Sequence, residues 1–369
     1  MPYLLRHYFD PGFDHRRLQP TERSDGSVDH RALNYVQNVI QDQVLAAWED
    51  LDAAEQGPGC PPHCEVFETK DFPAGPGTVV DPEDPDRLLA ERGGYVYYAD
   101  DGRITVKEEL NIRGDVDYST GDIAFVGDVV VHGQVRTGFT VSARRVTVHG
   151  QVEGAEVRAL RRIECPGGIK GGGRALLEAG TNLRAAFCEN AVLKAKRHVA
   201  VDTNCLHSRV FARGRLAVQG RITGGEYHFY EGCDVGERLG GGMNAATSLV
   251  GGYDPELVWL DRRAEARAEG LREEQADLEA LVERGAELAE EYGPRLEQVR
   301  ARLKRVEAGR VALWERSEAT ARFDGCRVRV RGRVLPGVEI SIGKAYLCVA
   351  EELENVTFAY DDCAIVVDP

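Results

Sequence analysis

A repeat of about seventeen residues constrains the fold of this chain more than any other feature. The segments VVVHGQVRTGFTVSARR (129–145) and VTVHGQVEGAEVRALRR (146–162) are equal in length and align without a gap. Residues 110–128 and 328–344 supply further versions, of which the first is slightly longer and the second has the same length. Less regular units start in between, at Ile163, Leu183, Val199, Leu216 and Cys233.

Units of this kind predict a β-solenoid. Alternating apolar residues direct every second side chain to one face, and glycine permits the positive-φ corners between short strands. One unit cannot bury its apolar residues alone, so stacked units form parallel ladders around one core. A β-sandwich of hairpins is the alternative, but the steady period without Asn-Gly turns disfavours it. With 41 Gly but only 2 Met and 11 Phe, the composition also fits a thin core of small and β-branched residues.

A charged helical segment interrupts the repeat. Asp254-Pro255 opens a run of apolar residues at steps of three and four, and Tyr292-Gly293-Pro294 marks its end. A second run of this kind extends from Leu296 to Leu313. Residues 255–294 have a net charge of −7 and residues 295–317 of +4, which favours antiparallel packing in a coiled-coil hairpin. An intermolecular coiled coil is the alternative.

These patterns divide the chain into four regions. Residues 1–92 carry 18 acidic and 8 basic side chains; within them, a helix is expected where apolar residues recur between Leu33 and Leu51, followed by a proline-rich connector. Residues 93–254 form the solenoid and residues 255–321 the hairpin. Residues 322–369 form a C-terminal β segment that docks back on the solenoid.

The repeat also resembles a known family. GDVDYSTGDIAFVGDVVVHGQV (114–135), GQVEGAEVRA (150–159) and RGRVLPGVEISIG (331–343) resemble the flagellar assembly protein A family of bacteria. The resemblance covers roughly residues 93 to 369. It implies a right-handed parallel β-solenoid, or β-helix. Together with the inserted antiparallel α-helical coiled-coil hairpin and a small α/β N-terminal region, this predicts a mainly β protein. The resemblance also implies a cytoplasmic role in flagellar assembly or its positioning and regulation, and brings no established catalytic residues. A more distant likeness is to the C-terminal solenoid of the septum-site cell-division inhibitor, which works through protein contacts.

Basic residues at the ends of successive units are the candidates for partner binding. Residues 129–232 carry 16 basic and 8 acidic side chains, and stacked units would align the unit ends into a positive ladder. This ladder could bind an acidic partner, a nucleic-acid backbone or an anionic lipid surface, or pair internally with the acidic N-terminal region or the acidic helix. The net charge of −15 argues against generic nucleic-acid binding. The candidates are Arg144, Arg145, Arg161, Arg162, Arg197, His198 and Arg215.

Four other motifs suggest chemistry, but each has a structural explanation. Cys60, His63 and Cys64 supply three soft ligands, but a structural zinc site needs four and no second pair follows. The glycines of Gly167–Arg174 lack the phosphate-loop spacing and suit a solenoid corner. His207 and Ser208 are adjacent and so point to opposite faces of a strand. The acidic residues of the first unit suit turns, although they could also serve polysaccharide chemistry: Asp115, Asp117, Asp122 and Asp128.

We therefore expect a non-enzymatic cytoplasmic scaffold or regulatory adaptor with no cofactor and no metal. Its partners would be proteins, either acidic or from the flagellar and chemotaxis system, and a homo-oligomer is compatible with the sequence. The sequence shows neither an apolar run long enough to span a membrane nor an apolar signal segment, so neither a transmembrane helix nor secretion is expected. The alternatives are a β-solenoid enzyme acting on an acidic polymer and a polymer-forming or cell-division-type solenoid.

Overall fold

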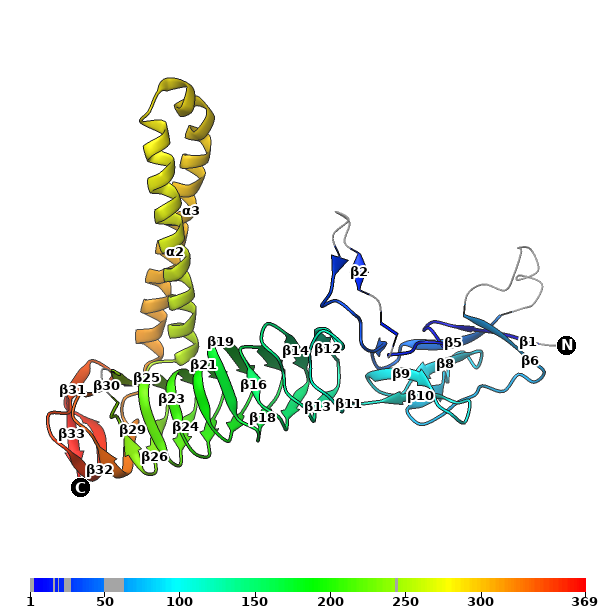
Figure 1. The fold of residues 1–369 in the computed structure, drawn as a ribbon, viewed down its shortest axis with the longest axis horizontal. Coiled ribbons are helices and arrows are strands. Elements are labelled where there is room, and N and C mark those ends of the chain that lie inside the picture. Colours follow the sequence, from blue (N-terminus) through cyan, green and yellow to red (C-terminus); the bar gives the residue numbers. More distant parts are fainter. Residues whose placement is uncertain (1–2, 16, 19, 23–27, 50–62, 243–244) are drawn as a thin grey trace. The chain divides into compact units, whose positions relative to one another are not determined.

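The computed structural model describes residues 3–15, 17–18, 20–22, 28–49, 63–242 and 245–369. The chain divides into two units, residues 1–192 and residues 193–369. The first contains the N-terminal region and the first coils of a parallel β-solenoid, and the second contains further coils, a helical hairpin and an antiparallel closing segment (Figure 1).

The N-terminal region is built on a five-stranded antiparallel sheet with the strand order β6-β1-β5-β8-β7. Its core contains Leu5, Leu45, Trp48 and Leu88. A second sheet has the order β10-β9-β4, and a pair of two-residue strands, β2 and β3, lies between β1 and β4 in sequence. The bounds are β1 Tyr3–His7, β2 Thr21–Glu22, β3 Val28–Asp29, β4 Asn38–Val39, β5 Val44–Glu49, β6 Cys64–Phe67, β7 Thr78–Val80, β8 Arg87–Ala90, β9 Gly94–Tyr98 and β10 Ile104–Lys107.

The helix expected between Leu33 and Leu51 does not form. Asp42 adopts a left-handed φ of 62°, and the residues that follow it form β5 between β1 and β8. Trp48 of this apolar pattern becomes buried in the sheet together with Leu45, which lies outside the pattern, whereas Ile40 of the pattern is 63% exposed. The apolar residues therefore gain a core through strand pairing, which overrides the local helical spacing; Leu51 lies outside the described residues.

The solenoid coils of the first unit stack in parallel at the period read from the sequence. Val129 pairs with Val146, Val146 with Ile163 and Ile163 with Leu183, and all four side chains are buried. One ladder contains β11 Glu109–Ile112, β13 Asp128–Val131, β15 Arg145–Val148, β18 Ile163–Cys165 and β20 Leu183–Ala185. The others contain β12 Ile123–Ala124, β14 Thr140–Ala143, β16 Val152–Glu153, β17 Glu156–Ala159 and β19 Ile169–Ala179. β21, Cys188–Ala195, spans the sequence division between the units.

The most regular glycines of the repeat allow close approach of neighbouring coils. Gly150 donates its backbone N–H to the Gly133 carbonyl over 3.0 Å, and a Cβ at Gly150 would overlap that carbonyl oxygen. A Cβ at Gly167 would overlap the carbonyl of Gly150 in the same way. None of these three has a positive φ; the expected left-handed corners occur instead at Gly138, with φ 86°, and Gly154, with φ 26°.

The second unit continues the parallel coils and ends in antiparallel strands. Its first ladder contains β22 Val199–Val201, β24 Arg215–Val218, β26 Gly232–Val235 and β29 Arg327–Val334. Its others contain β23 Cys205–Ala212, β25 Arg221–Phe229, β27 Arg238–Leu239, β28 Thr247–Gly251 and β30 Val338–Ile342. The closing strands are β31 Ala345–Cys348, β32 Leu353–Asp361 and β33 Ala364–Asp368. Strand β29, which follows the hairpin in sequence, thus pairs with β26, which precedes the hairpin.

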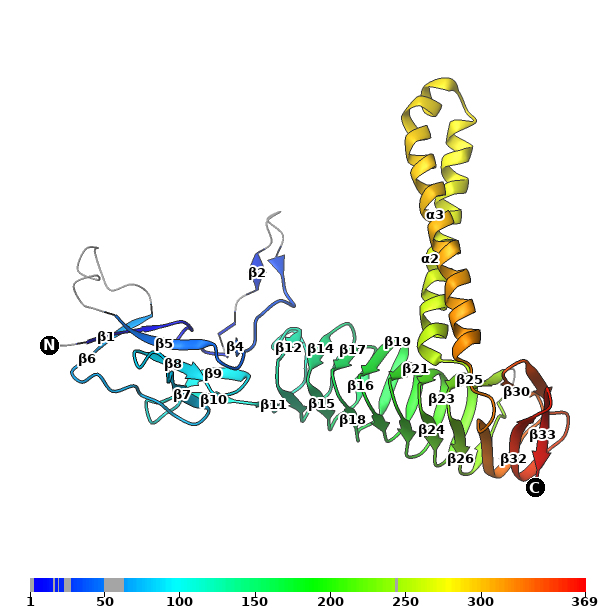
Figure 2. The same cartoon turned by 180° about the vertical axis from the view of Figure 1, so that it is seen from behind.

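An antiparallel helical hairpin is inserted between β28 and β29 (Figures 1 and 2). Asp254 caps α2, Pro255–Val282, by accepting a hydrogen bond from the Glu256 N–H. The turn lies at Gly285, earlier than the expected break, and Pro294 lies inside α3, Ala286–Thr320. Leu278, Leu296 and Val299 pack between the helices. The expected opposition of charge is also present, in the pairs Glu274–Arg295, Glu279–Arg300 and Asp261–Arg310.

The base of α2 packs on the solenoid through a mixed aromatic and charged cluster. Trp259 lies edge-on to Phe211 at 5.1 Å, and Phe211 stacks on His228 at 4.9 Å. Arg262 of α2 pairs with Glu226 of β25. His228 is 4% exposed, and neither of its ring nitrogens has a hydrogen-bond partner. The joint therefore contains a titratable group whose protonation would place a buried positive charge 4.0 Å from the Glu226 carboxylate.

Candidate functional site

Two pairs of candidate arginines lie at one corner of the first unit. Arg144 lies between β14 and β15, and Arg145 is the first residue of β15. One coil later, Arg161 and Arg162 lie between β17 and β18. The Arg161 N–H donates to the Arg144 carbonyl over 2.8 Å, and Thr181 takes the next position by donating to the Arg161 carbonyl over 2.7 Å. The basic ladder of this unit therefore has two rungs, and the longer spacing to the next coil replaces a third rung with Thr181.

Carboxylates of the solenoid and of Glu108, which directly precedes its first strand, partly neutralise this corner. Arg144 donates from Nε to Asp128 at 2.8 Å and from Nη2 to Glu108 at 3.2 Å. The hydrogen bond from Arg144, and then that from Arg92, lowers the pKa of Glu108. Arg145 lies 3.5 Å from Asp128, and Arg162 lies 3.4 Å from Glu164. The carboxylates in these pairs belong neither to residues 1–92 nor to the acidic helix, the two sources considered for internal pairing.

Arg161 is exposed and has no ion pair within the described ranges. It is the residue of this corner that keeps an unneutralised guanidinium. The attraction of this corner for an acidic group is therefore much smaller than the number of basic residues in the sequence suggests, because carboxylates neutralise most of the neighbouring arginines.

The corresponding corner of the second unit is also interrupted. Gly214 follows Arg197 in the next coil and donates its N–H to the Arg197 carbonyl over 2.6 Å. His198 Nδ1 accepts from the Arg215 N–H over 3.1 Å, which fixes this ring nitrogen as an acceptor. Arg215 also lies 3.6 Å from Asp234. Arg197 is exposed and has no ion pair among the residues described for this unit.

A more regular arginine ladder occurs where the sequence reasoning did not place one. Arg221 of β25 pairs in register with Arg238 of β27, and Arg238 pairs with Arg333 of β29. We call these three residues the coil-end ladder. Arg221 is paired with Glu237 at 3.2 Å and Arg333 with Glu352 at 3.3 Å. Arg238 is half-buried, its Nε is inaccessible to solvent, and this Nε has no hydrogen-bond partner.

The sequence contained part of the signal for this ladder. Strand β29 reads RVRVRGRV, and its arginines alternate with buried valines. Register across the helical insertion, residues 255–320, cannot be read from spacing, so the match of Arg333 to Arg238 required the structure. The other outward arginines of β29 extend the basic surface beside the ladder: Arg327, Arg329 and Arg331.

Two of the three metal candidates, His63 and Cys64, lie within the described residues. Cys60 lies outside the described residues. His63 has a left-handed φ of 72°, and its Nδ1 lies 3.7 Å from Asp10, while Cys64 begins β6. No group of three or more His, Cys, Asp or Glu side chains in the described part of the chain is arranged to hold a metal ion.

The acidic residues of the first coil serve backbone and ion-pair roles. Asp115 accepts from the Gln134 N–H at 2.8 Å and pairs with Arg136 at 2.9 Å. Asp117 accepts from the Ser119 N–H, and Asp122 from the Thr140 N–H, both at 2.8 Å. Asp128 is paired with Arg144. Each of these four carboxylates therefore already has a hydrogen-bond or ion-pair partner within the solenoid.

The other two motifs are also structural. Gly167–Arg174 runs into strand β19. Gly172 and Gly173 have a positive φ, and a Cβ at either position would meet no atom within 4 Å. His207 is left-handed, with φ 47°, and Ser208 donates to the Leu206 carbonyl over 2.8 Å. His207 and Ser208 thus do not form a nucleophile and base pair.

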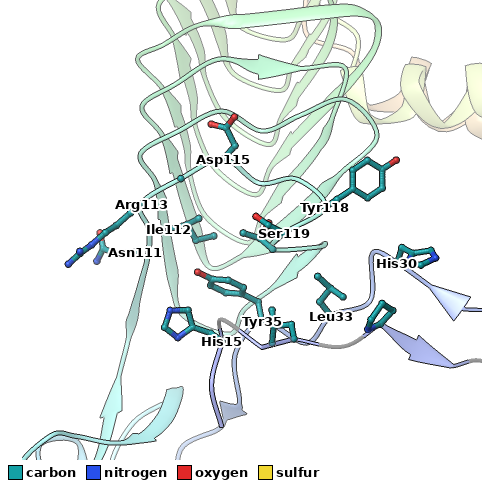
Figure 3. A pocket seen from close by; sticks show the side chains of 14 residues that line it. His15, His30, Leu33, Tyr35, Asn111, Ile112, Arg113, Asp115, Tyr118 and Ser119 are labelled. Carbon is teal, nitrogen blue, oxygen red and sulfur yellow. The ribbon is translucent and has the colours of Figure 1, made fainter.

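A cavity of about 870 Å³ within the first unit is lined by residues of the N-terminal region, among them His15, His30 and Tyr35, and by residues of the first solenoid coil (Figure 3). Ile112 and Leu33 are buried residues of its lining. Arg113 and Tyr118 are exposed residues of the same lining, and Figure 3 shows their side chains directed away from Ile112. Arg31 of the N-terminal region donates from Nη1 to the Gly138 carbonyl over 2.7 Å.

Comparison with known families identifies the architecture. The family model described as Flagellar Assembly Protein A beta solenoid domain matches residues 108–365, and that described as Flagellar Assembly Protein A N-terminal region matches residues 7–101. The chain belongs to the Flagellar Assembly Protein A family. No curated protein and no solved structure matches it.

Family membership connects this chain to flagellar assembly, as its resemblance implied. The solenoid match includes both arginine corners, the coil-end ladder and the inserted hairpin. The N-terminal match extends the family likeness to a region that the sequence resemblance did not cover. Neither α2 nor α3, the helices within the described ranges, is long and apolar enough to cross a membrane.

Proposed function

We propose that this protein is a non-enzymatic cytoplasmic scaffold or regulatory adaptor in flagellar assembly or its positioning. The observation that carries the proposal is a rigid ladder of registered parallel strands from which the helical hairpin projects as a separate arm. Parallel coils fix outward side chains at regular spacing, and solenoids commonly use such surfaces to bind other proteins.

The local use of the candidate catalytic groups supports this proposal over an enzyme. The carboxylates of the first coil hold backbone N–H groups and arginines, and the pKa shifts of buried thiols run against reactivity. Burial raises the pKa of the Cys165 and Cys233 thiols well above their ordinary value, which suppresses the nucleophilic thiolate. A solenoid enzyme acting on an acidic polymer would have to use other groups.

Hairpin removal is a direct test because the structure brings its ends together. The Arg322 N–H donates to the Gly252 carbonyl over 2.8 Å, so a short glycine linker can replace residues 255–320 without separating β28 from β29. The deleted form and the full chain are expressed in a strain that lacks the gene, and flagella are counted by electron microscopy. Partners are captured by cross-linking in parallel.

We expect the full chain to restore flagellar number or position and to capture specific protein partners. The deleted form should keep the solenoid signal in circular dichroism but lose at least one partner and part of the restoration. Restoration by the full chain without any specific protein partner would refute the adaptor proposal. Product formation from a panel of acidic polysaccharides would instead support the enzymatic alternative.

A further inference from the structure

The coil-end ladder leaves a positive charge without a local partner. Adjacent β-strands are about 4.8 Å apart, and like charges directly opposite each other are destabilising. Glu237 and Glu352 compensate the outer two arginines, but Arg238 has no carboxylate partner in the described part of the chain. The ladder is thus suited to receive carboxylates.

The hairpin carries a complementary surface. Glu269, Glu273 and Asp277 are exposed along α2 at steps of four residues, and none is in an ion pair with any described residue. We call these three residues the acidic ridge. The positions three and four residues away from its members include exposed small residues, which leave the ridge accessible to another surface: Ala266, Gly270, Ala276 and Ala280.

The two surfaces cannot meet within one copy of the chain. The position of Glu269 in α2 places it about 21 Å along the helix from Pro255, the first helical residue. The hairpin projects away from the solenoid strands of its unit (Figures 1 and 2). An arginine side chain spans far less than this separation.

We infer that the acidic ridge of one copy binds the coil-end ladder of a second copy. Carboxylates at steps of four residues lie about 6 Å apart along a helix, and the ladder arginines lie about 4.8 Å apart across strands, a difference that long side chains absorb. Arginine forms planar, paired hydrogen bonds to carboxylates. The contact would give the guanidinium of Arg238 a carboxylate partner, and it goes beyond the proposed flagellar function.

Charge exchange between two variants provides the sharpest test. The purified full chain is examined by sedimentation velocity at 50 mM and 500 mM NaCl, followed by R238E and E273R alone and by an equimolar mixture of the two. E273R is on an exposed helical surface, so it remains informative if R238E fails to fold. R174E is the matched control, because Arg174 is exposed and without an ion pair in the described part of the first unit. Circular dichroism verifies the fold of each variant.

We expect the unmodified chain and R174E to self-associate at low salt, with weaker association at high salt. Each of R238E and E273R should raise the dissociation constant by at least about tenfold, because a charge pair becomes a repulsion. The mixture should recover association, since one reversed ladder can then meet one reversed ridge. A monomeric unmodified chain, association unaffected by E273R, or a mixture as weak as its components would each overturn the inference. Binding of an acidic protein or single-stranded nucleic acid to the ladder without self-association would overturn it as well.

Discussion

Gly150→Ala should open the solenoid locally, because this glycine allows two coils to approach. A Cβ at Gly150 would lie 2.5 Å from the Gly133 carbonyl carbon and 2.9 Å from the Gln134 nitrogen, whereas ordinary contact begins near 3.4 Å. The two coils must therefore separate by about 1 Å, which costs about 1–3 kcal/mol as overpacking. The hydrogen bond from the Gly150 N–H to the Gly133 carbonyl contributes about 1 kcal/mol more. We expect a local destabilisation of about 2–4 kcal/mol.

Hydrogen exchange measured by mass spectrometry is the suitable assay, because it reports the opening of single coils where unfolding of the whole chain need not be two-state. Amides of β13 and β15 should exchange about 30-fold to 1,000-fold faster in the variant. Gly114→Ala is the matched control. Gly114 occupies the same column at the first coil, has no positive φ, and a Cβ there would have nothing within 4 Å.

The control should change exchange by less than about threefold, since it neither strains the backbone nor meets a neighbouring coil. Equal protection in Gly150→Ala and the unmodified chain would refute the reasoning. So would equal acceleration in the Gly114→Ala control, because the effect would then come from the substitution itself and not from the approach of a second coil.

Three further predictions concern single groups. Burial lowers the pKa of His228, with Glu226 opposing and Arg262 reinforcing the shift, so the unfolded chain binds this proton more readily and stability should fall as the pH drops below about 6.5. The urea midpoint of H228F should therefore decrease less between pH 7.5 and pH 5.5 than that of the unmodified chain, and equal decreases would contradict this. Asp254→Ala should cost about 2 kcal/mol by removing the cap of α2 and the partner of Arg213, and faster proteolysis at the hairpin base than in the unmodified chain should reveal it. Iodoacetamide should label the exposed thiols of Cys348 and Cys363 in the native chain before the buried thiol of Cys326, whose pKa burial raises to about 12. Peptide mass spectrometry measures the order of labelling, and the reverse order would refute this.

The solenoid could be predicted because its pattern is periodic and its contacts repeat. Val129 and Val146 are one repeat apart in sequence and are paired neighbours in the structure, so a local period determines a long-range contact. The opposite charges of the two helical segments likewise predicted their antiparallel pairing. The family resemblance rested on these same repeating residues.

Other features depended on competition that the sequence does not display. The spacing of Leu33, Val44 and Trp48 suits a helix, but pairing of β5 with β1 and β8 buries more of this segment than an isolated amphipathic helix would. Pro294 looked like a helix end, yet α3 continues through it while the chain turns at Gly285. The chain loses one helical hydrogen bond at the proline, and packing of α3 against α2 supports the helix on either side.

The sequence alone determined the coil period, the inward residues and the presence of a charged hairpin, because each is encoded by neighbours at fixed spacing. Only the tertiary structure decided which charges remain available. Asp128 and Glu108 neutralise Arg144 across coils, whereas Arg238 keeps an unpaired guanidinium because register after the hairpin places Arg333 beside it. Electrostatic interaction depends on distances of a few ångströms between residues far apart in the chain, and a charge count along the sequence does not contain those distances.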